Sequence, residues 1–168
     1  ILMMPSTGTY ATAFYGCTGL ETVALPDGLT EIAARAFSGC SKLASVRLPS
    51  TLTSIGEYAF YDCKALADVV VPEKITTLSR SLFAGCTGLK SVTIPAGVKT
   101  IDSGTFNKCS ALESIELPEG LTTLGSQAFM NCSALKSVRI PDGGTAIPNE
   151  TFAYCSVLET VELPSALK

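Results

Sequence analysis

The seven cysteines are the residues of this 168-residue chain best suited to chemistry. A thiolate can bind zinc, attack a substrate or join a second thiol in a disulfide. Zinc sites use close pairs such as Cys-x-x-Cys, and no such pair exists because every interval between cysteines is 23 residues. The chain has no His, the usual base of nucleophile–base triads and the commonest metal ligand. No phosphate-binding loop or paired acid–base motif is present, so the sequence predicts no catalytic residue and no cofactor.

Disulfide bonding between neighbouring cysteines is the next possibility. Cysteines in adjacent structural units would lie near the disulfide Cα range of about 4.4 to 6.8 Å. Their side chains would point in parallel into a core, however, and an odd count leaves one unpaired. Free Cys also behaves as a small buried hydrophobe. We therefore predict a ladder of reduced core thiols, with one or two disulfides or a metal site as alternatives. The cysteines are Cys17, Cys40, Cys63, Cys86, Cys109, Cys132 and Cys155.

The same 23-residue spacing governs the elements that would position these thiols. A Phe lies three residues before every Cys and a Leu three residues after it, and the unit reads P-x-x-L-x-x-I-x-x-x-A-F-x-x-C-x-x-L-x-x-V-x-L. The pattern predicts a solenoid, in which no single coil can bury its apolar face alone. The Phe column is assigned to the core and consists of Phe14, Phe37, Phe60, Phe83, Phe106, Phe129 and Phe152.

Each unit divides into two local patterns. In Leu-x-x-Val-x-Leu the apolar residues alternate, which predicts a short strand, and the following Pro, lacking an N–H, ends it. In the other half, Ile32, Ala36, Phe37 and Cys40 lie at i, i+4, i+5 and i+8, one face of a short helix. The Gly, Ser and Asp residues that follow the Ile column suit a helix cap. We expect an α/β repeat: a right-handed solenoid of about seven coils, with a parallel sheet on its concave face and helical turns on its convex face.

Length and charge bound the function. The net charge of −3 argues against a nucleic-acid binder, which normally carries a basic face, and no apolar run approaches the roughly 20 residues of a membrane span. We predict a single domain over 1–168, with a degenerate N-terminal half-coil over 1–13 and a truncated last coil over 165–168, as part of a longer protein. The open C-terminal coil would expose apolar columns and a strand edge, a route to end-to-end self-association.

The motifs over residues 14–164 resemble those of leucine-rich repeat proteins, and among them the BspA-like or treponemal type of bacterial surface proteins. That type is marked by Ala-Phe-x-x-Cys-x-x-Leu and by Leu-Pro at the strand end. The sixth coil departs from the pattern, with Gly144 in the Leu column and Thr151 in the Ala column. The resemblance implies a non-enzymatic protein at the cell surface or secreted. It also implies adhesion, with a surface or host protein as partner.

Binding, if it occurs, is expected at the outward strand positions of the concave face. These positions vary in charge and size while the core columns hardly vary, which fits either a recognition surface or plain solvated surface. Asp68 beside Arg47, and Glu116 beside Arg139, are placed to pair across neighbouring coils. The leading interpretation is a protein-interaction module, and the alternative is a rigid spacer without a ligand. The candidate residues are Arg47, Asp68, Val70, Thr93, Glu116, Arg139 and Glu162.

Overall fold

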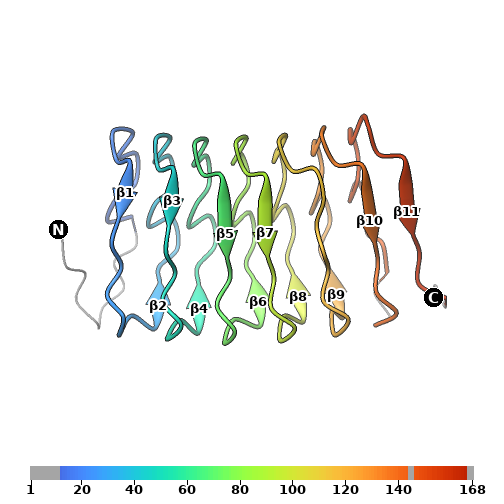
Figure 1. The fold of residues 1–168 in the computed structure, drawn as a ribbon, viewed down its shortest axis with the longest axis horizontal. Helices are drawn as coiled ribbons and strands as arrows, with labels where there is room; N and C mark the ends of the chain where they lie inside the picture. The colour runs from blue at the N-terminus through green and yellow to red at the C-terminus, as the bar shows by residue number, and fades with distance from the viewer. Residues whose placement is uncertain (1–11, 144–145, 166–168) are drawn as a thin grey trace.

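The computed structural model describes residues 12–143 and 146–165, and the half-coil predicted over 1–13 and the last coil predicted over 165–168 lie almost entirely outside these ranges. The described chain is a β-solenoid of about six turns. Six periods of 23 residues separate Phe14 from Phe152. Successive coils lie side by side along the long axis of the molecule (Figure 1).

Short parallel strands form two columns that run along the solenoid (Figure 1). The first column is the predicted one, and it consists of β1 (Thr22–Val23), β3 (Ser45–Val46), β5 (Asp68–Val70), β7 (Ser91–Thr93), β10 (Ser137–Arg139) and β11 (Thr160–Glu162). In the coil between β7 and β10, only an isolated bridge from Ser114 to Ser137 continues it. The second column consists of β2 (Glu31–Ile32), β4 (Ser54–Ile55), β6 (Thr77–Leu78), β8 (Thr100–Ile101) and β9 (Thr123–Leu124).

The strands pair in parallel and in the register that the period dictates. Each residue lies opposite the one 23 positions later, as Val69 lies opposite Val92. Pairing is not continuous along the first column, because β1 pairs with β3, β5 with β7 and β10 with β11 as separate two-stranded sheets. In the described residues the ladder is therefore interrupted between β3 and β5 and again between β7 and Ser114, and it is reduced to a single bridge just before β10.

The core is a stack of identical side chains, as the period predicts. Consecutive rings of the Phe column have centroids 5.2 to 5.8 Å apart and planes within 14° of parallel. The five inner rings, Phe37 to Phe129, are fully buried, and Phe14 and Phe152 at the two ends of the stack are half-buried. Burying one such ring contributes about 2 to 3 kcal/mol, so this column carries a large part of the stability.

The predicted helical turns are wrong, since the described residues contain no helix. The Ile column instead forms the second column of strands, and tight turns follow it. The N–H groups of Arg35, Phe37 and Gly39 donate to carbonyls of the next coil, at distances of 2.7 to 2.9 Å. The N–H groups between them bond three residues back within the coil. In a helix each N–H would donate to the carbonyl four residues earlier in the same coil. The hydrogen bonds that join neighbouring coils would then be lost.

Two columns of left-handed residues produce these turns. All the positive-φ residues in the described part of the chain fall in them, with φ between 51° and 78°. A residue with φ in this range cannot continue a right-handed helix. The first column is Thr12, Arg35, Tyr58, Ser81, Gly104, Gln127 and Glu150, and the second is Gly16, Gly39, Asp62, Gly85, Lys108, Asn131 and Tyr154.

Because the described residues contain no helix, the predicted capping role of the residues after the Ile column is also wrong. Two of these residues, Gly56 and Gly125, are needed for close approach between coils. A Cβ on Gly56 would lie 2.3 Å from the backbone nitrogen of Ala34, and one on Gly125 would lie 2.3 Å from that of Ser103. Real side chains do not reach such distances, so these positions favour glycine for space between backbones.

Candidate functional site

The exposed side of the first strand column, which we call the strand face, holds all seven predicted site residues. The strands bury alternate residues, so that in β5 the side chain of Val69 enters the core while those of Asp68 and Val70 stay exposed. The other five predicted residues are also exposed. Thr93, Arg139 and Glu162 are the last residues of β7, β10 and β11. Arg47 directly follows β3, and Glu116 lies two residues after the bridge at Ser114.

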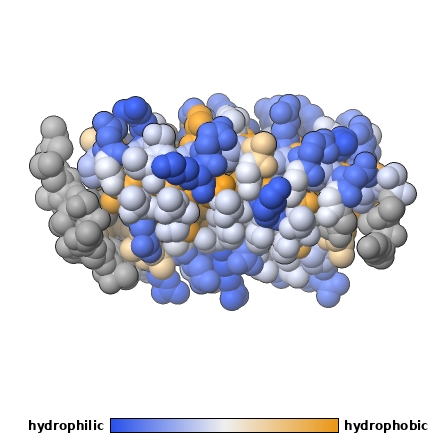
Figure 2. Space-filling view, turned by 90° about the horizontal axis from the view of Figure 1, so that it is seen from below, coloured by the Kyte–Doolittle hydropathy of each residue, from blue (hydrophilic) through white to orange (hydrophobic). Residues whose placement is uncertain are grey.

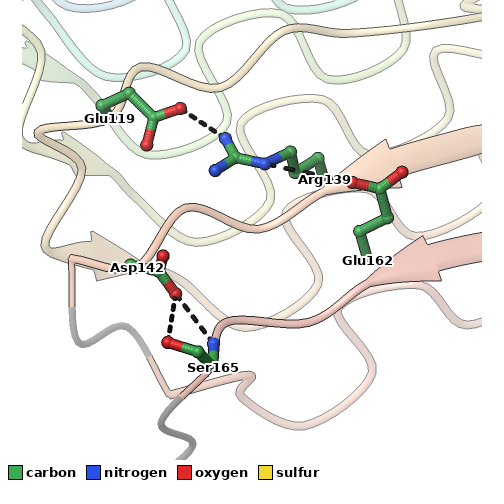
Figure 3. Close-up of polar contacts among 5 residues, drawn as sticks. All are labelled: Glu119, Arg139, Asp142, Glu162 and Ser165. Atoms are coloured by element: carbon green, nitrogen blue, oxygen red, sulfur yellow. Dashed lines mark hydrogen bonds and ion pairs between the residues drawn. The ribbon is translucent and has the colours of Figure 1, made fainter.

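Each of the two arginines on the strand face lies against carboxylates. Arg47 pairs with Asp27 at 3.9 Å, and not with Asp68 as the sequence suggested. Arg139 pairs with Glu119 through a short contact and with Glu162 at 3.9 Å, and not with Glu116 (Figure 3).

The partners missed in this way come from the turn after the Pro, five residues beyond the start of each strand. Asp27 and Glu119 belong to that column, and so does Asp142, which accepts hydrogen bonds from the Ser165 N–H at 2.8 Å and its hydroxyl at 3.1 Å (Figure 3). A long arginine side chain reaches this turn in the previous coil, and the period alone does not reveal it.

The electrostatics of this cluster follow from its contacts. The hydrogen bond and charge of Glu119, with smaller effects of Asp142 and Glu162, raise the pKa of Arg139. The two hydrogen bonds from Ser165 lower the pKa of Asp142. Both pKa shifts favour the charged forms of Arg139 and Asp142, and Arg139 lies among the carboxylates that surround it (Figure 3).

The strand face is hollowed in two places. A hollow of about 500 Å³ lies between the β3 and β5 coils and is lined by residues including Arg47, Asp68, Val70 and Glu73. A second, of about 310 Å³, is lined by Ile115, Glu116, Leu117, Glu119 and Arg139. Both lie where the strand ladder is interrupted or reduced to one bridge. Val70 stands at the first hollow with two thirds of its surface exposed, although it is aliphatic.

The thiols are held in the core as donors. Each Cys from Cys40 to Cys155 donates its S–H to the carbonyl oxygen of the Phe 26 residues earlier, with Sγ···O distances of 3.1 to 3.3 Å. Burial raises the pKa of the Cys63 thiol to about 12, and the neighbouring Cys40 adds to the effect. All seven cysteines are free, and Cys17 is exposed. The buried thiols are thus kept protonated, which removes the nucleophilic form.

The described residues also bear on metal binding and on membrane spanning. Within 12–143 and 146–165 there is no group of three or more His, Cys, Asp or Glu placed to hold a metal ion. The same residues include no helix long and apolar enough to cross a membrane.

A second group of polar and aromatic side chains lies on the turn side of the coils. The guanidinium of Arg35 lies 5.1 Å from the ring centroid of Tyr58, which contacts Tyr61 edge-on at 5.9 Å. Tyr58 and Tyr61 therefore pack against side chains of the turns. Seen from below, the molecule is mostly hydrophilic or neutral, with hydrophobic atoms showing only in small areas (Figure 2).

Comparison with known proteins gives one consistent result. Residues 7–111 and 76–168 match the model of the BspA type leucine rich repeat region, in six copies. A leucine-rich repeat protein of T. pallidum is similar in structure with a TM-score of 0.81 and 32% identity, covering 94% of this chain and 77% of that one. No curated protein sequence matches the chain.

Two further solved structures extend the likeness. A leucine-rich repeat protein of Eubacterium ventriosum matches with a TM-score of 0.74 and 25% identity, over 98% of this chain and 42% of that one. One of Bacteroides ovatus matches with a TM-score of 0.54 and 26% identity, over 98% of this chain and 63% of that one. The chain thus spans less than two thirds of these two relatives.

Proposed function

The chain belongs to the BspA type of leucine-rich repeat proteins, and from that premise we propose that it is a non-catalytic module that binds another protein through its strand face. The two hollows on that face carry the proposal. The larger hollow lies where the strand ladder is interrupted between β3 and β5, and the smaller lies where the ladder is reduced to one bridge. The larger also holds Val70, the only large aliphatic side chain exposed within a strand of the described residues. The contact area of a non-obligate complex is about as apolar as the rest of a protein surface, so a face that combines charged and apolar residues is compatible with one.

A location at the cell surface or outside the cell, with adhesion to a surface or host protein, is the form of this function that the family favours. Sequence variation along the face supports recognition, since Arg47, Val70, Thr93 and Glu116 occupy equivalent positions in successive coils with four different chemistries. The columns beneath them hardly change. The strand face also differs from coil to coil in shape, with hollows at some coils and regular strand pairing at others, which a surface without a ligand does not require.

A rigid spacer is the second candidate, favoured by the construction of the core. The continuous Phe stack and the cross-links between turns would hold a long array stiffly without any ligand. The two functions differ in what they require of the strand face.

The test is binding of the purified chain to a panel of purified extracellular and cell-surface proteins, by biolayer interferometry. The variant carries Arg47→Ala, Glu116→Ala and Arg139→Ala. The matched control carries Arg35→Ala, Glu57→Ala and Arg80→Ala, with the same change of charge on the turn side. The proposal predicts that a panel protein binds and that only the strand-face variant loses it. Binding that both variants retain would place the function elsewhere, and absence of binding would favour the spacer.

A further inference from the structure

We propose that the segment seated on the strand face is cationic: an extended, Lys- or Arg-rich stretch of a partner protein. This rests on the proposed function, because it names the chemistry of the partner for the same face. It follows from the distribution of charge, from the two hollows, and from which carboxylates of the face form salt bridges.

The acidity of the chain is concentrated on this face. The exposed positions of the first strand column, together with the one residue directly after the Pro that ends each strand, hold seven carboxylates and two arginines. The remainder of the sequence, which includes the exposed Lys74 next to Glu73, holds ten basic and eight acidic residues. A partner approaching this side meets a net negative surface, and one approaching elsewhere does not. The seven carboxylates are Asp27, Asp68, Glu73, Glu116, Glu119, Asp142 and Glu162.

The two arginines of the face already pair with carboxylates, and several of its acidic side chains form no salt bridge. Both arginines lie against carboxylates, as described above. In the described ranges Asp68, Glu73 and Glu116 form no salt bridge, although they line the two hollows. An incoming cation can therefore pair with these three side chains without breaking an existing contact. An incoming anion would meet Arg47 and Arg139 already paired with carboxylates.

The shape of the hollows fits the same occupant. The larger hollow combines the carboxylates of Asp68 and Glu73 with the apolar surfaces of Leu48, Val70 and Pro72. Lysine and arginine side chains have this dual character, with an apolar stem that covers aliphatic surface and a charged head.

The spacing of the hollows favours an extended segment. Glu73 and Glu119 are two coils apart, which corresponds to about 10 Å at the usual strand separation. An extended chain advances about 3.3 Å per residue, so three residues or so bridge the hollows. One short basic stretch can thus reach both.

The test uses fluorescein-labelled decalysine as the probe, with decaglutamate as the probe of opposite charge, and measures anisotropy on titration with the full chain at low salt. The strand-face variant is Glu73→Gln with Glu116→Gln. The matched control is Glu31→Gln with Glu57→Gln, which makes the same chemical change at exposed positions in β2 and in a turn, off the strand face.

We expect decalysine to bind, decaglutamate not to bind, and salt near 1 M to abolish binding because the screening length falls to about 3 Å. Each exposed pair lost weakens binding by about 1.4- to 5-fold, so the strand-face variant should bind about 2- to 30-fold more weakly. The control variant should bind like the wild type. Equal weakening in both variants would show attraction to net charge alone and would overturn the proposal, as would absence of decalysine binding.

Failure here is distinguishable from failure of the proposed function. If a panel protein binds through the strand face while decalysine does not, the interaction function stands and the cationic partner is refuted. If decalysine binds as expected and no panel protein does, the cationic preference of the face stands, and the spacer is favoured over the interaction function.

Discussion

The buried thiol ladder should make the fold sensitive to alkali. Burial raises the pKa of Cys63 from 9.0 to about 12 and, as the largest of several causes, raises the pKa values of Cys86, Cys109 and Cys132. In the unfolded chain these thiols return to ordinary values near 9.0. Their contribution to stability is therefore fully present below about pH 9 and is lost as the pH rises towards the folded values, because only the unfolded chain releases the protons.

The magnitude follows from the count of fully buried thiols, which are these four and Cys40, whose pKa burial raises to about 11. At about pH 10, one unit above the unfolded pKa, each favours the unfolded chain by about 1.4 kcal/mol, which gives about 7 kcal/mol in total. This is comparable to the whole stability of a typical domain, about 5 to 15 kcal/mol. The free energy of unfolding should thus fall by several kcal/mol between about pH 8 and about pH 10.

Urea unfolding followed by circular dichroism, with a reductant present at each pH, measures this slope. Cys63→Ala should reduce the slope above pH 9 by about a fifth, since one of five fully buried thiols no longer contributes. Cys17→Ala, at the exposed cysteine, is the control and should leave the slope unchanged. A stability that stays level from pH 8 to pH 10, or a slope indifferent to Cys63→Ala, would refute the placement of the thiols in the core.

Three further outcomes follow from the core and the turns. Phe83→Ala should cost about 3 to 5 kcal/mol and split the urea transition into two, whereas Phe14→Ala, at a half-buried end of the stack, should cost clearly less; equal costs would contradict the stack. Lys108 and Gly39 both have left-handed φ values. In the same assay Lys108→Gly should therefore stabilise the protein by about 0.5 to 1 kcal/mol, and Gly39→Ala should destabilise it by about 1 kcal/mol. A loss of stability in Lys108→Gly would argue against the left-handed conformation. At about pH 8 a thiol reagent should label one cysteine of the native chain quickly, Cys17, and all seven only after unfolding; rapid native labelling of several would contradict the burial.

The period made most of the architecture predictable. A strict 23-residue repeat fixes both which side chains share a core column and which residues lie opposite one another, so the pairing of Val69 with Val92 follows from the sequence. The Phe stack and the buried cysteines follow in the same way.

The helix was mispredicted because its signal is ambiguous. Apolar residues at Ile32, Ala36, Phe37 and Cys40 fit one helix face, and they equally fit a strand end followed by tight turns. The turns depend on left-handed φ values at the column of Arg35, where the residue types of successive coils include Arg, Tyr, Ser, Gln and Glu. Such residues carry no sequence signature of that conformation, and the bonds between coils stabilise it instead.

The candidate site was predictable in position but not in detail. Alternation along the strands places Asp68 and Val70 outside, as the structure has them. The pairing of Arg47 with Asp27 depends on the reach of a long side chain into the turn of the previous coil. The breaks in the strand ladder that accompany the hollows leave the apolar columns intact, so no residue pattern marks them.

The most direct test of the interaction surface is hydroxyl-radical footprinting of the chain with and without a bound panel protein. It compares Val70 and Leu48 on the strand face with Tyr61 and Tyr154 on the turn side, all of which are at least partly exposed in the free chain. The proposed function predicts protection of Val70 and Leu48 and unchanged oxidation of both tyrosines. Protection of the tyrosines with Val70 still reactive would contradict it and would place the binding surface on the turns.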